Sequence, residues 1–486
     1  MLKSSKLLKV LSSFCALCMA ASFFCTSPVS AAATRKVGDV DGNGNITNID
    51  AMIIQRHVTK QKVITDSAAL KAADVDFDGK VTNKDALLIQ RYVLKLAEIT
   101  PLKDSKWNAP CLNAANTIAL KRSFAASQVK VSVPSAHKYW LSASVVKSGS
   151  YVTGIKVTTT RNSYIKSRSA TITVTVEGNN YNLTVTQTPD GGYRGVLRTD
   201  TQYLYDKLVE YYYINHKYAD FTVDVSSLNY TVDNYFDKGW AVACTISDDY
   251  PEIFWENLGA IGCSITSSGV TTITFKRRDT YQNAYKDIGT FTDRVEQAVK
   301  QIEERANAIQ SKYNCSQEYA NVYAIHEYIC LHSNYMPDAK KIKDEKTGKD
   351  DFPPVSQAAA PLFGLGDQDH EYVCAGYSSA FKLLCSRFNL PCLVMSGPNH
   401  AWNYVQMENG EWYGVDVTWD DKYKGNPTQI DKNAYKQIKY DNFLMGNTFR
   451  ETHKHDAYVI DGKTFNYPTF ETKDYPNKIL NIPFDL

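Results

Sequence analysis

Two stretches near the start of the chain repeat one another, and they constrain its folding more than any other feature. Residues 39–60 read DVDGNGNITNIDAMIIQRHVTK, and residues 74–95 read DVDFDGKVTNKDALLIQRYVLK, which aligns with the first stretch without a gap. Each stretch opens with twelve residues that carry oxygen-bearing side chains at positions 1, 3, 5, 9 and 12 and glycine at position 6. Calcium prefers about six to eight oxygen ligands, which a short loop with glycine at its sharp turn can wrap around one ion. The repeat therefore predicts two loops that each bind one Ca²⁺.

The residues expected to hold the two ions follow from these positions. Position 7 contributes a backbone carbonyl, so it can carry different side chains in the two loops. A pair of ordinary acidic surface loops is the alternative, but nothing in such loops requires the same spacing twice. The predicted ligands are Asp39, Asp41, Asn43, Asn45, Thr47 and Asp50 in the first loop and Asp74, Asp76, Asp78, Lys80, Thr82 and Asp85 in the second.

Apolar residues at helical spacing predict a helix after each loop, and neither repeat shows a convincing helix before its loop. In these features, and in the Ile-Gln-Arg shared by both helices, residues 37–98 resemble a type I dockerin, a small all-α module. The resemblance implies two Ca²⁺ ions and, as partner, a cohesin domain on the scaffold protein of a cellulosome. It also implies that the residues facing the cohesin are Asn48, Ile49, Gln55 and Arg56 in the first repeat and Asn83, Lys84, Gln90 and Arg91 in the second.

The first 33 residues read as a secretory signal peptide. Lys3, Lys6 and Lys9 precede an apolar run over residues 10–24, and small residues follow at 30–33. This order of a positive start, a short apolar run and an A-x-A-like end is typical of a cleaved signal. The run is too short for a membrane anchor, and no second apolar stretch follows it. We therefore expect a secreted, extracellular protein without a membrane span after cleavage, and the dockerin resemblance implies that it is cellulosome-bound.

Charge and cysteine usage exclude some classes of function. The net charge of +2 and the lack of a basic cluster give no reason to expect a nucleic-acid partner. Eight of the eleven cysteines lie after the predicted signal peptide, scattered widely and without a C-x-x-C pair among them. Such spacing fits neither a disulfide framework nor a structural zinc site.

The middle of the chain changes pattern twice. Residues 99–110 read as a linker, and short runs rich in Val, Ile and Thr over 110–190 predict an all-β sandwich. The closing stretch YNLTVTQTP (181–189) loosely resembles Ig-like or BACON modules, and a spacer is the expected role of this region. Residues 195–310 read as a mixed α+β lead-in region, which ends in a long amphipathic helix over 291–313. The motif HEYIC at 326–330 is not a zinc-protease motif, because its fifth residue is Cys330 rather than histidine.

A cysteine at the start of a helix is the first sign of catalysis. Residues 371–385 read EYVCAGYSSAFKLLC. Apolar residues at helical spacing predict a helix that begins at Cys374 and runs to about Phe388. The N-terminus of a helix favours a thiolate. Taken alone, a buried structural cysteine remains the more frequent case.

Two further residues join Cys374 through a predicted hairpin over 399–421. A three-residue loop at 408–410 pairs Met407 with Glu411 and gives the hairpin one apolar face. In this register His400 and Asp416 share the opposite face as diagonal neighbours, within reach of a hydrogen bond. Cysteine, histidine and aspartate are the set needed for nucleophilic acyl transfer. Singly, His400 could be a core histidine and Asp416 an edge-strand surface residue.

The blocks YVCAGYSSAF, NHAWNYV and WYGVDVTWDD resemble the bacterial transglutaminase-like superfamily, which has a papain-like α+β fold. The resemblance implies a catalytic domain over 311–486 in which Cys374 is the nucleophile, His400 the base and Asp416 the acid. It also implies that Tyr377, Trp402 and Trp419 line or support the cleft. Many relatives carry glutamine where this chain has Ala375.

These features predict a cysteine protease or amidase that acts on a protein or peptide substrate and needs no cofactor for catalysis. Protein crosslinking is possible but less expected, because water is the abundant acceptor in an extracellular cleft. Two other classes stay open. One is a catalytically silent module that binds peptide or glycan. The other is an accessory role in polysaccharide breakdown, although the C-terminal half of the chain shows no evident pair of carboxylates of the kind that a glycosidase needs.

Overall fold

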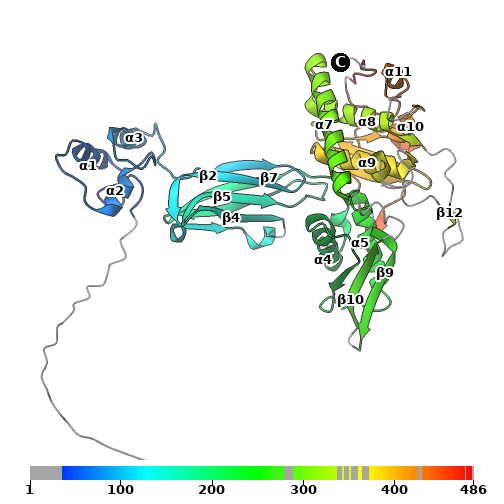
Figure 1. Cartoon of the computed structure of the whole chain (residues 1–486), viewed down its shortest axis with the longest axis horizontal. Helices are drawn as coiled ribbons and strands as arrows, with labels where there is room; N and C mark the ends of the chain where they lie inside the picture. The colour runs from blue at the N-terminus through cyan, green and yellow to red at the C-terminus, as the bar shows by residue number, and fades with distance from the viewer. Residues whose placement is uncertain are drawn as a thin grey trace, which may run out of the picture. The chain divides into compact units, whose positions relative to one another are not determined.

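The computed structural model describes residues 35–483 except 139, 255, 268, 278–287, 336–341, 344–349, 352–358, 364–370, 424, 426–429 and 477. The predicted signal peptide lies outside the described residues. Contacts divide the chain into two compact units, one ending at Pro101 and one beginning at Leu102 (Figure 1). No helix among the described residues is both long and apolar enough to cross a bilayer.

The first unit holds three helices: α1 (Asn48–Val58), α2 (Ser67–Ala73) and α3 (Asn83–Val93). A capping box opens α1 and another opens α3, because the threonine before each helix exchanges hydrogen bonds with the aspartate at its third position. The two helices pack on one another through buried alanine and isoleucine side chains. The expectation of no helix before either loop is wrong for the second loop, which α2 precedes. With seven residues, α2 is too short to show helical periodicity, and its local signal is the cap formed by Asp66.

The second unit begins with a β-sandwich. One sheet has the order β1-β7-β6-β3 and the other β2-β5-β4. Side chains alternate between core and surface along the strands, as expected when one face of each sheet is covered. The strands are β1 (Ser105–Ala109), β2 (Ala114–Ala125), β3 (Val129–Ser132), β4 (Leu141–Ser148), β5 (Tyr151–Thr159), β6 (Arg168–Val176) and β7 (Asn179–Gln187).

The sandwich starts earlier than the sequence suggested. Strand β1 lies inside the segment read as a linker and pairs in parallel with β7, whereas the other pairs are antiparallel. Polar residues fill most of β1, and only Ala109 is fully buried, so its sequence does not stand out from a loop.

The region after the sandwich forms helices around two small antiparallel sheets, with strand orders β8-β10-β9 and β15-β16-β17. Its main elements are α4 (Thr199–Val209), the π-helix η4 (Glu210–Ile214), β8 (Phe221–Asp224), α5 (Tyr235–Asp249), β9 (Glu256–Thr266), β10 (Gly269–Arg277), α7 (Ile288–Tyr313), α8 (Gln317–His332), α9 (Cys374–Arg387), β15 (Cys392–Ser396), β16 (Ala401–Gln406), β17 (Trp412–Val415) and α10 (Val417–Asp420). Its short elements are η3 (Arg194–Val196), β11 (Asn334–Tyr335), β12 (Ile342–Lys343), β13 (Asp350–Asp351), η7 (Ala360–Phe363), β14 (Glu371–Tyr372), α11 (Lys432–Tyr435), α12 (Phe449–Thr452), β18 (Val459–Ile460) and β19 (Lys463–Thr464), whereas η1 (Ala126–Gln128) and η2 (Ser135–His137) lie in the sandwich.

One hydrophobic cluster runs through this whole region, from Tyr193 to Ile482. The boundary placed near residue 310 therefore does not separate two cores. Helix α9 packs on β15 and β16 and also contacts α8. This packing holds α9 against the β15-β16-β17 sheet.

The register of the β16–β17 hairpin is as predicted. Gln406 pairs with Trp412, the Met407 amide donates to the Glu411 carbonyl over 3.0 Å, and Gly410 closes the loop with φ of 82°. The predicted second strand is longer than the one in the structure. It ends at Val415, and the residues that follow form α10, because the Asp416 side chain accepts from the Trp419 amide and caps a helix there.

Candidate functional site

The candidate site begins with the thiol of Cys374, the first residue of α9. The helix starts there because the Val373 carbonyl accepts from the amides of Gly376 and Tyr377, while Val373 itself is extended. Cys374 is half-buried, and all eight cysteines after the first 33 residues are free thiols in the structure. The position at the helix start agrees with the sequence analysis.

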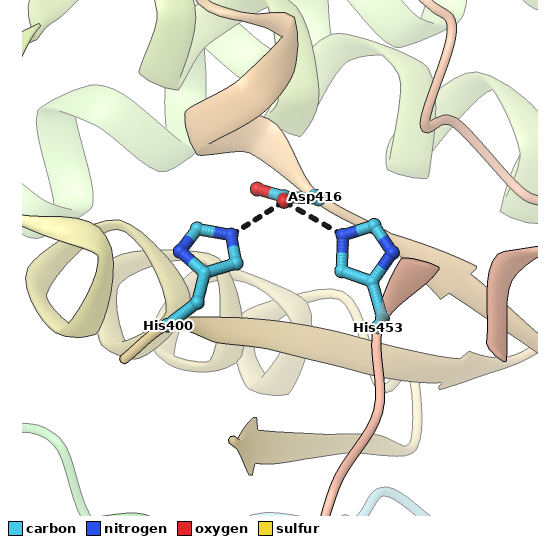
Figure 2. A group of neighbouring side chains, drawn as sticks. All are labelled: His400, Asp416 and His453. Carbon is cyan, nitrogen blue, oxygen red and sulfur yellow. Dashed lines mark hydrogen bonds and ion pairs between the residues drawn. The ribbon is translucent and has the colours of Figure 1, made fainter. Parts of the chain in front are cut away.

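Asp416 lies where β17 ends and α10 begins, and its side chain is fully buried. Its Oδ1 atom accepts from the Trp419 amide over 3.0 Å. Its Oδ2 atom lies 2.6 Å from Nε2 of His400 and 2.9 Å from Nε2 of His453 (Figure 2). Because an ionised carboxylate only accepts, each of these Nε2 atoms carries a proton. These donors oppose the effect of burial and hold the pKa of Asp416 below its usual range.

His400 precedes β16 and connects Asp416 with Cys374. Its ring directs Nε2 at Asp416, and its other nitrogen points away from the carboxylate (Figure 2). Burial opposes the charged imidazolium, but hydrogen bonds with Asp416 and with Cys374 outweigh it and raise the pKa of His400 to about 9. The predicted hydrogen bond between His400 and Asp416 is thus present, and Cys374 interacts with the same ring. The catalytic roles of the three residues stay predictions.

The three residues expected to support a cleft lie in different surroundings. Tyr377 is buried and donates its hydroxyl to Asp421 over 2.5 Å. Trp402 is buried beside the ring of His400. Trp419 is 40% exposed and stacks on His400, with ring centroids 5.0 Å apart and an angle of 17° between the planes. Trp419 is therefore the one of the three that offers a surface next to the imidazole.

Sequence reasoning missed His453. This buried histidine follows α12 and lies 37 residues after Asp416 in the chain, outside any periodic pattern that includes it. The segment THKH holds His453 and His455, and nothing in it indicates which ring faces inward. The structure separates them, because His453 is buried on Asp416 whereas His455 meets the Asp456 carbonyl in an exposed contact.

The calcium loops bring their predicted carboxylates together. Within each loop, the oxygens of three carboxylates lie within 4.8 Å of one another. The residues are Asp39, Asp41 and Asp50 in the first loop and Asp74, Asp76 and Asp78 in the second. The glycine at position 6 has a positive φ in both loops, 90° at Gly44 and 85° at Gly79, as the sharp turn requires. This donor set suits a hard cation such as Ca²⁺.

The remaining predicted ligands have other contacts. Thr47 and Thr82 act as helix caps, accepting from the amides of Ile49 and Lys84. Asp85 accepts from the backbone of its own loop, as Asp50 does in the first loop. The side chain of Asn43 donates to Asp41, and the backbone amides of Asn45 and Lys80 donate to position 5 of their loops.

His400, Asp416 and His453 are a third group whose nitrogen and oxygen atoms lie within 4.8 Å of one another. The Nε2 atoms of His400 and His453 both point at Oδ2 of Asp416, at 2.6 and 2.9 Å, and each can donate a hydrogen bond to it.

The residues expected to face a cohesin lie on the surface of the first unit. Seven of them are exposed: Asn48, Ile49, Gln55, Arg56, Asn83, Lys84 and Arg91. The eighth, Gln90, is half-buried. Lys84 forms an ion pair of 2.7 Å with Asp76 of the second loop. Ile49 of the first repeat and Lys84 of the second occupy equivalent positions. The two repeats therefore differ there, with an exposed isoleucine in one and a lysine paired with Asp76 in the other.

Comparisons with known proteins identify the first unit. Residues 37–94 match the family model of the dockerin type I domain, so this segment is a dockerin type I domain. It also matches two structures of the third cohesin ScaC in complex with the ScaB dockerin from Acetivibrio cellulolyticus, one with a mutated N-terminal helix and one with a mutated C-terminal helix. The identities are 37% and 36%, over 14% of this chain and 93% and 92% of those chains, with a TM-score of 0.13 for both.

A further structure is less similar to this chain. A GH5 xyloglucanase from Bacteroides ovatus is 18% identical over 20% of this chain and 19% of its own, with a TM-score of 0.14, a level that says nothing about activity. No curated protein matches the chain.

Proposed function

We propose that the region after the sandwich is a cysteine-dependent acyl-transfer enzyme that hydrolyses peptide or other amide bonds, with the papain-like arrangement of transglutaminase-like proteins. We further propose that the dockerin type I domain attaches this enzyme, in a calcium-dependent manner, to a cohesin domain of an extracellular scaffold protein. The substrate class is protein or peptide.

The observation that carries the enzymatic part is the double contact of His400. One ring nitrogen donates to Asp416 over 2.6 Å, and the ring also interacts with Cys374. An imidazole between a thiol and a buried carboxylate can take the thiol proton and keep the resulting charge. The raised pKa of His400, about 9, shows that its charged form is stabilised in this position between Asp416 and Cys374.

The proposed reaction has two stages. In the first, the Cys374 thiolate attacks the amide carbonyl carbon, a C–S bond forms, and the oxyanion is held by backbone amides at the start of α9. His400 then gives its proton to the leaving nitrogen as the C–N bond breaks, which leaves a thioester. In the second stage, His400 takes a proton from water and the water oxygen attacks the thioester carbon. The C–S bond then breaks, the carboxylic acid leaves, and His400 returns its proton to the sulfur of Cys374.

The test is a peptide library treated with the full-length protein, with and without an added amine. Cys374→Ala is the blank, and His400→Ala is the control for activation of the thiol. We expect shortened or deamidated peptides from the unaltered protein alone. Products that carry the added amine would replace hydrolysis with crosslinking as the function. No product of either kind, together with a Cys374 that does not react with iodoacetamide, would reject catalysis in favour of a silent binding module.

The docking part is tested separately with a panel of purified cohesins. Titration calorimetry should show binding in Ca²⁺ that is lost after chelation. The Acetivibrio cellulolyticus complex is described as displaying a type I interaction, so type I cohesins are the first to try. Binding that survives chelation would contradict a calcium-dependent dockerin.

A further inference from the structure

Asp416 has a second imidazole partner that the proposed triad does not use. His453 approaches from the end of α12, on the opposite side of the carboxylate from His400 (Figure 2). Its Nε2 atom lies 2.9 Å from the same Oδ2 atom that His400 meets at 2.6 Å. The side chain of His453 is fully buried, whereas that of His400 is 19% exposed. A proton-transfer role towards substrate therefore falls to His400 alone.

The ring of His453 is held on several sides by aromatic packing. It stacks on Phe449, with centroids 3.7 Å apart and planes 4° from parallel. Trp419 and Trp402 pack against it at 4.4 and 5.1 Å. Phe449 can lie there because residue 414 of β17 is glycine, and a Cβ atom on Gly414 would overlap the phenyl ring. The orientation of His453 is thus set by the fold, independently of Asp416.

The far nitrogen of His453 also has partners. Its Nδ1 atom lies 2.9 Å from the Thr452 hydroxyl and 3.2 Å from the Phe449 carbonyl. The hydroxyl can donate to a neutral ring, and the carbonyl can accept from a charged one. In either protonation state the proton on Nε2 therefore remains directed at Asp416.

With His453 included, both oxygens of Asp416 are fixed by groups other than the proposed base. Oδ1 accepts from the Trp419 amide, and Oδ2 accepts from His453. A carboxylate held in this way cannot turn when His400 gains or loses a proton. We propose that His453 is a positioning residue, which fixes the carboxylate of Asp416 so that it stays directed at His400 throughout acyl transfer. This inference rests on the proposed function, and His453 acts through Asp416 without touching the substrate.

The experiment measures the rate at which iodoacetamide alkylates Cys374 in the full-length protein between pH 4.5 and 10, read by mass spectrometry of the peptide that contains it. His453→Phe keeps a stacking ring but removes the donor. His453→Gln places an amide donor near the position of Nε2, so it is the conservative rescue. His453→Asn is a second variant without the contact, because its amide is too short to reach Oδ2.

We expect alkylation of Cys374 at pH 5 to slow by about tenfold in His453→Phe and His453→Asn, because a carboxylate that can turn away from His400 supports its charged imidazole less well. His453→Gln should restore the profile of the unaltered protein to within about threefold. His326→Phe is the matched control, because His326 is equally buried and bonds Asp420 over 3.1 Å. His326→Phe should leave the alkylation rate of Cys374 at low pH unchanged. Tyr335, Cys330, Asp420 and Asp421 are titratable groups near the site, and they are the same in all the His453 variants.

The outcomes separate this inference from the proposed function. A Cys374 that is unreactive, or equally reactive in His400→Ala, rejects the triad itself. A reactive, His400-dependent Cys374 whose profile is the same in His453→Phe rejects the role of His453, as does an equal shift in His326→Phe.

If the loss variants do not fold, NMR of ¹⁵N-histidine-labelled unaltered protein decides. Two hydrogen-bonded Nε2–H signals that both change in Asp416→Asn support the proposal, and a single such signal rejects it.

Discussion

The carboxylate of Asp416 is the residue on which the candidate site depends, because it accepts three hydrogen bonds without any exposure to solvent. The raised pKa of His400 depends on this carboxylate as well as on Cys374. A group whose pKa is higher in the folded protein stabilises the fold below its unfolded value, and this contribution is lost as the pH rises through the folded value. For His400 the range is from 6.5 to about 9.

Asp416→Asn should therefore flatten the dependence of stability on pH in this range. The amide keeps the shape of the side chain but removes the negative charge. The folded protein then stabilises the charged form of His400 much less. Urea unfolding at pH 6, 7, 8 and 9 should show a free energy of unfolding that falls with pH in the unaltered protein and less steeply in the variant. Equal slopes in the two proteins would contradict the assignment of the raised pKa to this pair.

Gly414 is the second residue with a specific consequence. A methyl group at this position would overlap the ring of Phe449, which in turn stacks on His453. We expect Gly414→Ala to lower the free energy of unfolding by about 2 kcal/mol, as overpacking of a close-packed core does. Gly262→Ala in β9 is the control, because the nearest atom to its Cβ would be 4.0 Å away. A similar cost for both glycines, measured by chemical denaturation, would show that Gly414 has no special packing role.

At the scale of elements, the β16–β17 hairpin shows what sequence can determine. Its register follows from the apolar face, since a shift by one residue would turn every side chain of a strand to the other side. The sequence pattern predicts a strand that continues past Val415, because Val417 and Trp419 extend the alternation of apolar residues. The hydrogen bond from the Trp419 amide to Asp416 forms a helix cap there instead, and such local competition is not visible in the pattern.

His453 lay beyond sequence reasoning for a different reason. Its contact with Asp416 joins residues 37 apart across an irregular segment, and no periodicity specifies it. The two predicted calcium loops are the opposite case, because the carboxylates that meet in each loop are close together in the sequence. Their number and position followed directly from the repeat, and the family match confirms the dockerin over residues 37–94.

The two calcium loops give a prediction about stability. Three carboxylates lie within 4.8 Å in each loop and repel one another unless a cation neutralises them. Chelation should therefore unfold the first unit and leave the second unit intact. Calorimetric scans should show two transitions in Ca²⁺, of which EDTA shifts or removes only one. Loss of both transitions would mean that the two units do not unfold independently.

The stoichiometry tests the same loops one at a time. Calcium titration should give two ions for the unaltered protein and one ion for Asp39→Ala or for Asp74→Ala. Asp441→Ala, which removes an exposed carboxylate from the second unit, should still bind two.

At the scale of the molecule, the sandwich is more than a spacer within the second unit. Arg161 and Asp190, from segments at the end of the sandwich, form a buried ion pair of 2.5 Å. Lys382 of α9 pairs with the same aspartate over 3.1 Å, and Ser386 donates to it over 2.7 Å. Helix α9, whose first residue is Cys374, is thereby joined to the sandwich by charges that water does not reach.

Asp190→Asn should accordingly disturb the site as well as the fold. The variant leaves Arg161 and Lys382 buried with one negative partner fewer, and removing one member of a buried pair costs about 3–5 kcal/mol. Asp206→Asn is the matched control, because Asp206 pairs with Arg194 over 2.5 Å while its side chain is 48% exposed, and exposed pairs contribute about 1 kcal/mol or less. Urea unfolding should separate the two variants, and the alkylation rate of Cys374 should fall in Asp190→Asn alone. If both variants lose the same small amount of stability and Cys374 reacts normally in each, the sandwich and the candidate enzyme are coupled only by proximity. The larger loss, accompanied by slower alkylation, would instead make the sandwich part of the scaffold that orients the thiol.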